Sequence, residues 1–121
     1  MVALSGLFIT GCVKDDTLTI KPTVTVITKT VSFKTDLVPL FVANCAVSGC
    51  HDARNPVLKA DLAYNSLVNG KFIDTKTPAS SIIYKRLTGV LSPAMPFGKP
   101  TNPGNINGLV LAWITQGGKN N

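Results

Sequence analysis

The chain has a single histidine among its 121 residues, and that residue, His51, directly follows Cys50. A Ser-His-Asp or Cys-His arrangement for hydrolysis would have to use this one imidazole, and no supporting pattern surrounds it. Glycine-rich phosphate loops of the P-loop or dinucleotide-binding type are also absent from the sequence. The residue pattern therefore gives no support to a hydrolase or a transferase, and we expect a protein that is not an enzyme.

Acidic residues are scarce: six Asp and Glu stand against 12 Lys and Arg, which leaves a formal net charge of +6. This balance favours an acidic partner. The basic residues are scattered and do not alternate with aromatic ones, so we do not expect nucleic-acid binding. The length is that of one domain, and the apolar fraction of 45% argues against a chain that is disordered throughout.

No apolar run approaches the about 20 residues needed to span a bilayer. Residues 1–11 are apolar and uncharged, and they read as the remnant of a signal peptide. The stretch from Ile9 to Cys12 resembles the bacterial lipobox, which predicts that Cys12 carries lipid and that the protein is exported and anchored at a bacterial membrane, on the periplasmic side or at the cell surface. No Lys or Arg precedes Cys12. The alternative is an ordinary apolar N-terminus with a buried cysteine.

Residues 12–30 are rich in Thr, Val and Lys, and β-branched residues favour extended chain. We interpret them as an extended linker, with one edge strand laid on the domain as an option. Residues 31–121 are expected to form an all-α domain, because apolar residues recur there at helical spacing. We expect Asp36, Ser80 and Asn105 to cap three of its helices. The four expected helices cover residues 37–45, 60–69, 81–87 and 106–116, and the segment between the last two, rich in Pro and Gly, is expected to be a long loop.

Three chemistries are compatible with Cys45, Cys50 and His51, which lie within seven residues. A zinc site is disfavoured, since structural zinc takes four ligands and the chain has no second pair of them. A disulfide between the two cysteines is possible in an exported protein, and it leaves His51 without a role. Covalent haem attachment commonly uses C-x-x-C-H. Here four residues lie between the two cysteines, and the second of them is still followed immediately by His.

Met95 is the only methionine after Met1, and it lies in the Pro-rich segment as SPAMPFG. A methionine commonly fills a gap in a core. Next to prolines its backbone is stiff, which suits the presentation of a sulfur atom at a fixed place. His and Met together form the iron-ligand pair of cytochromes c.

The stretches VSFKTDLVPLFVANCAVSGCHD, SSIIYKRLTG, AMPFG and INGLVLAWITQGG resemble the small monohaem c-type cytochrome domains of bacterial exported proteins. The resemblance covers residues 31–121. It implies thioether attachment of one haem at Cys45 and Cys50, with His51 as proximal and Met95 as distal iron ligand. It also implies a cytochrome c-like fold in which the first and last helices cross beside the haem. The departure from the common motif is the four-residue gap between the two cysteines.

Phe41 and Trp113 are the candidates for packing against the haem at the contact of the two helices. Tyr84, Lys85 and Arg86 are candidates to meet the haem propionates, and a solvated helix face is the alternative for all three.

The expected function is one-electron transfer by a membrane-anchored monohaem cytochrome c, with an acidic redox protein as its partner. Two alternatives stay open. One is a haem-based sensor or enzyme with an open distal site, and the other is a haem-free surface lipoprotein stapled by a disulfide.

Overall fold

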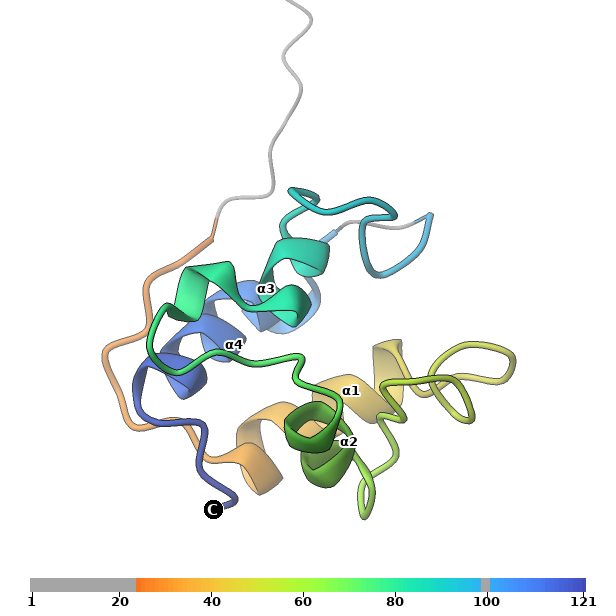
Figure 1. Cartoon of the computed structure of the whole chain (residues 1–121), viewed down its shortest axis with the longest axis horizontal. Helices are drawn as coiled ribbons and strands as arrows, with labels where there is room; N and C mark the ends of the chain where they lie inside the picture. Colours follow the sequence, from red (N-terminus) through yellow and green to blue (C-terminus); the bar gives the residue numbers. More distant parts are fainter. Residues whose placement is uncertain (1–23, 99–100) are drawn as a thin grey trace, which may run out of the picture.

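The computed structural model describes residues 24–98 and 101–121, and in these residues it contains helices, turns and extended segments but no strand (Figure 1). The all-α prediction is confirmed for the part of the chain described. In chain order the elements are the π-helical turn η1 (Phe33–Leu37), α1 (Val38–Asn44), α2 (Ala63–Asn69), the 3-10 turn η2 (Pro78–Ser80), α3 (Ile82–Leu87), the 3-10 turn η3 (Pro103–Asn105) and α4 (Ile106–Thr115).

The first helical segment begins four residues earlier than the sequence predicted, because a serine caps it. The Ser32 hydroxyl accepts a hydrogen bond from the main-chain N–H of Thr35 at 3.2 Å. In return, the Asp36 carboxylate accepts from the main-chain N–H of Ser32 at 2.8 Å. This reciprocal arrangement resembles a capping box. The prediction that Asp36 caps the helix is therefore wrong, and Ser32 is the N-cap.

Neither of the other two expected caps forms a side-chain capping hydrogen bond, although Asn105 does hold the N-cap position of α4. Ser81, and not Ser80, precedes α3, and its hydroxyl accepts from the main-chain N–H of Asp74 at 2.8 Å. Asn105 precedes α4 without a side-chain capping hydrogen bond. The side-chain oxygen of Asn102 instead accepts from the main-chain N–H of Asn107 at 2.9 Å.

An aromatic cluster forms the centre of the core between η1, α1, α2 and α4. The ring of Phe33 lies 4.9 Å from that of Trp113 and 5.5 Å from that of Tyr64, measured between centroids. Phe41 joins the cluster through Phe33, at 6.1 Å. Pairs in this range add about 0.5–1.5 kcal/mol each beyond the burial of their area. The apolar residues of α4 recur three and four positions apart, which predicts one buried face. Ile106, Val110, Trp113 and Ile114 are buried as this spacing predicts, and Leu109 is partly buried against the core.

Residues 24–32 form an extended segment that lies along α4, and we call it the N-terminal strap (orange in Figure 1). Two side-chain amides from the ends of α4 hold its backbone. Asn105 accepts from the N–H of Thr25 at 3.1 Å and donates to its carbonyl at 2.8 Å. Gln116 accepts from the N–H of Val31 at 2.8 Å and donates to the carbonyl of Lys29 at 2.9 Å.

A third amide continues this pattern at the C-terminal end of the strap. Asn121 accepts from the N–H of Phe33 at 2.9 Å and donates to the carbonyl of Val31 at 3.3 Å. The part of the expected linker that the structure describes, residues 24–30, is therefore attached to the domain. The edge strand offered as an option is not formed there, because the strap pairs with side-chain amides and has no neighbouring strand.

Candidate functional site

The segment that joins Cys45 to His51 is a closed loop immediately after α1. The main-chain N–H of His51 donates to the carbonyl of Cys45 at 3.0 Å, which brings the two ends together. Between them, the N–H of Cys50 donates to the carbonyl of Val47 at 3.0 Å and closes a tight turn. Gly49, the third residue of that turn, has φ +80°, as a type II turn requires. The additional residues between the cysteines thus form an exposed turn, and the ends of the motif stay adjacent.

The two cysteines of this loop differ in environment. The side chain of Cys45 is buried beside the core, whereas Cys50 is exposed, and both are free thiols. Burial, with a smaller contribution from the neighbouring Cys50, raises the pKa of the Cys45 thiol to about 11. The loop therefore holds two reduced sulfurs, one facing the domain and one facing solvent.

The ring of His51 is held by main-chain carbonyls. Its Nδ1 lies 2.9 Å from the carbonyl oxygen of Pro56 and 3.4 Å from that of Arg54. Because a carbonyl oxygen only accepts, Nδ1 must carry the proton, and the neutral ring then has its lone pair on Nε2. The main chain of His51 is fixed as well, since its carbonyl accepts from the N–H of Leu58 at 2.8 Å. A hydrogen bond from the second ring nitrogen is the common way to orient a metal-binding histidine.

Met95 lies in a different loop, and residues 88–98 of this loop contain no regular structure, as predicted. The end of the expected loop differs, because the 3-10 turn η3 begins at Pro103. Its main-chain N–H donates to the carbonyl of Arg86, in the last turn of α3, at 2.8 Å, and its side chain is half-buried. In Figure 1 this loop and the loop of Cys45 to His51 extend from the helices on the same side of the view. Cys45, Cys50 and His51 thus lie together in one loop, and Met95 lies in another loop that follows α3.

The three residues proposed for propionate contacts lie on α3, and one of them has another partner. The guanidinium of Arg86 donates to the carbonyl of Pro93 at 3.2 Å, within the Met95 loop. The sequence pattern did not indicate this contact. The propionate role of Tyr84 and Lys85 stays a prediction.

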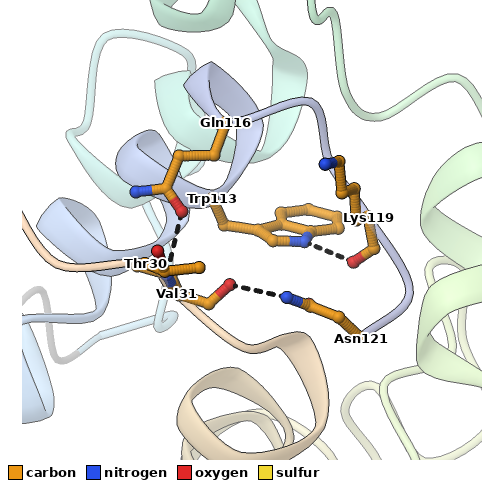
Figure 2. A pocket seen from close by; sticks show the side chains of 6 residues that line it. All are labelled: Thr30, Val31, Trp113, Gln116, Lys119 and Asn121. Atoms are coloured by element: carbon orange, nitrogen blue, oxygen red, sulfur yellow. Dashed lines mark hydrogen bonds between the residues drawn. The ribbon is translucent and has the colours of Figure 1, made fainter.

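Phe41 and Trp113 are buried in the aromatic cluster, and the indole N–H of Trp113 donates to the carbonyl of Lys119 at 2.7 Å. Their contact with a haem stays a prediction. A pocket of about 230 Å³ opens beside Trp113 (Figure 2). The side chains that line it are those of Thr30, Val31, Trp113, Gln116, Lys119 and Asn121. It belongs to the strap region and contains none of the motif residues.

The described residues contain no group of three or more His, Cys, Asp or Glu side chains placed to hold a metal ion. No helix in residues 24–98 and 101–121 has the length and apolar character needed to cross a membrane. The predicted lipidation residue, Cys12, lies outside the described residues. In comparisons with known proteins, no family model, no curated protein and no solved structure matches this chain.

Proposed function

We propose that this protein is a one-electron carrier, a c-type cytochrome domain with one covalently attached haem, held at a bacterial membrane by lipid on Cys12. The observation that carries the proposal is the state of His51. Its Nδ1–H is engaged by the carbonyl of Pro56 at 2.9 Å, so that Nε2 is left with the lone pair that an iron ligand needs.

The neighbouring residues fit the attachment of a haem. Cys45 and Cys50 are both free thiols, and they lie in the same closed loop as His51. The exposed turn from Val47 to Cys50 accommodates the longer spacing without separating the ends of the motif. Cys45 and Cys50 would hold the haem through their sulfurs, and His51 and Met95 would hold its iron. A bound haem would supply an iron atom that gains and loses one electron.

The residues of the chain contribute orientation and binding to such a carrier. His51 is oriented by its loop, and Met95 is presented by a loop that is attached to α3. The turn η1, which continues into α1, packs against α4, and this contact supports the expected pairing of the first and last helical segments. The net charge of +6 favours an acidic redox protein as the partner and predicts faster association at low salt.

The test is an optical spectrum of the protein from bacterial cells that mature c-type haem, oxidised and then reduced, followed by a pyridine haemochrome assay after denaturation. We expect a c-type spectrum, haem that stays bound through denaturation, and a far-red sulfur-to-iron band in the oxidised state. The variant Cys50→Ser should lose one of the two attachments, whereas Ser48→Ala, exposed in the same turn, serves as the matched control. A colourless protein from these cells would overturn the proposal and favour the disulfide-stapled lipoprotein.

The lipid anchor is tested separately with the variant Cys12→Ser. We expect the unchanged protein to sediment with membranes and the variant to be released from them, without a change in the optical spectrum. Equal release of both proteins would overturn the lipid anchor and leave the cytochrome proposal intact.

A further inference from the structure

The loop that carries Met95 is attached to α3 by hydrogen bonds, and its two most exposed apolar side chains do not anchor it. Val90 is 72% exposed and Phe97 is 76% exposed, so burial of these two side chains contributes little to the position of the loop. Met95 itself is only half-buried. Leu91, Ala94 and Pro96 are partly buried as well, so the polar contacts of the loop act together with these side chains to place the sulfur of Met95.

These polar contacts converge on the last turn of α3. The main-chain carbonyl of Arg86 accepts from the N–H of Met95 at 2.8 Å, and the carbonyl of Lys85 accepts from that of Leu91 at 3.0 Å. The guanidinium of Arg86 donates to the carbonyl of Pro93 at 3.2 Å. Arg86 thus contacts the loop both at Met95 and two residues before it, once through its backbone and once through its side chain.

The side chain of Arg86 differs from the other contacts of this loop, which are made between main-chain groups. In the part of the chain that the structure describes, it is the one side chain that forms a hydrogen bond with residues 90–98. A hydrogen bond from a charged donor to a carbonyl is stronger than one between neutral groups. The main-chain contacts remain when a side chain of α3 is replaced, so a substitution of Arg86 removes this one contact selectively.

We propose that Arg86 is a positioning residue for Met95: its guanidinium holds the loop so that the thioether is kept available as an iron ligand. This inference rests on the proposed function and specifies how its distal ligand is retained. Arg86 acts through the loop and not on the iron, and its assignment replaces the propionate contact expected from the sequence. Loosening the loop would favour replacement of Met95 by a ligand from solution.

The test compares the haem-loaded protein with the variants Arg86→Ala, Arg86→Lys and Lys34→Ala. The two readouts are the far-red sulfur-to-iron band and the equilibrium binding of cyanide to the oxidised protein. For Arg86→Ala we expect a weaker band and cyanide affinity raised about tenfold, the scale of one hydrogen bond from a charged donor. Arg86→Lys retains a charged donor on a different side chain and should restore part of both properties.

The variant Lys34→Ala is the charge control, since it removes an exposed positive charge of η1 that has no side-chain hydrogen bond among the described residues and no proposed contact with the haem. It should leave the band and the cyanide affinity unchanged. A purely structural role of Arg86 would lower the urea midpoint of Arg86→Ala without weakening the band, and this result would overturn the inference. Equal cyanide affinity in Arg86→Ala and the unchanged protein would also overturn the inference, without contradicting the proposed function.

The failure of the proposed function has a different signature. If the unchanged protein contains haem c but lacks the far-red band, Met95 is not a ligand, and both the His/Met pair and the role of Arg86 are overturned while haem attachment stands. If the unchanged protein is colourless, attachment fails and the inference fails with it.

Discussion

The substitution Gly108→Ala tests whether the strap lies against α4. Tertiary structure and helix propensity predict opposite signs for its effect on the free energy of unfolding. It lies within α4 and is buried. A Cβ at this position would collide with the main-chain carbonyl of Thr25 and would come within 2.6 Å of the side-chain nitrogen of Asn105. Propensity alone predicts that Gly108→Ala stabilises the protein by about 1 kcal/mol. The structure predicts a loss, because the new methyl group occupies the place of the strap.

The size of the loss follows from the contacts that would be displaced. Thr25 and Asn105 share two hydrogen bonds, at 3.1 and 2.8 Å. Each contributes about 0.5–1.5 kcal/mol net, so that breaking both costs about 1–3 kcal/mol. After the propensity gain of about 1 kcal/mol is subtracted, we expect Gly108→Ala to lower the free energy of unfolding by about 1 kcal/mol.

The assay is urea unfolding followed by the fluorescence of Trp113, performed on the full chain and on a chain shortened to begin at Ile27. In the shortened chain Thr25 is absent, and Gly108→Ala should then stabilise the protein by about 1 kcal/mol. Thr25→Ala leaves the main-chain carbonyl in place, so this control should change stability by less than about 0.5 kcal/mol. If Gly108→Ala stabilises the full and the shortened chain equally, the strap does not lie against α4 and the reasoning is refuted.

Three further predictions concern single side chains. Gln116→Ala removes both hydrogen bonds that this residue makes to the strap, and it should lower the free energy of unfolding by about 1–3 kcal/mol in urea; an unchanged midpoint would contradict it. In protein produced without haem, iodoacetamide should alkylate exposed Cys50 faster than Cys45 at pH 8, as followed by peptide mass spectrometry. Because the pKa of Cys45 is raised from the ordinary 9.0 to about 11, its thiolate at pH 8 is about 100-fold rarer than that of an ordinary thiol. The greater nucleophilicity of this thiolate reduces the expected difference in rate to about tenfold, and the burial of Cys45 slows the reaction further. Equal rates would show that Cys45 is accessible. The hydrogen bond from Lys29 lowers the pKa of Asp36 below its ordinary value of 3.8, with a further contribution from a main-chain N–H. The unfolded state then binds the proton more readily, so the stability that Asp36 contributes is present above its unfolded pKa and is lost as pH falls through its folded pKa. Below about pH 4, the free energy of unfolding should therefore decrease less steeply with falling pH in Asp36→Asn than in the unchanged protein. Identical slopes for the two proteins would contradict this cause.

Much of the secondary structure could be predicted because it depends on neighbours in sequence. The apolar face of α4 was visible as residues three and four apart, and Ile106, Val110, Trp113 and Ile114 are buried as expected. Helix caps were predicted less well, although the predicted start of α4 at residue 106 is confirmed. Asp36 pairs with Ser32 and Lys29 and is not the N-cap, and a propensity for capping does not distinguish between nearby polar residues that have other partners.

The candidate site also has features that the sequence predicted and features that it did not. Cys45, Cys50 and His51 are kept close by the short chain between them, so their grouping was evident from spacing alone. The carbonyl of Pro56, which orients the His51 ring, lies only five residues away, but the sequence carries no signal for it because every residue has a carbonyl. The contact of Arg86 with the Met95 loop was missed for the same reason, since its partner is also a main-chain carbonyl.

The sequence by itself determined the helical class of the described residues, the apolar face of α4 and the grouping of the two cysteines with the histidine. These features depend on residues that are close along the chain. Only the tertiary structure decided that residues 24–30 are attached to α4, because Asn105 reaches Thr25 across 80 positions of sequence. A side-chain amide that binds backbone N–H and carbonyl groups leaves no pattern in the segment that it holds, since these groups are common to almost every residue.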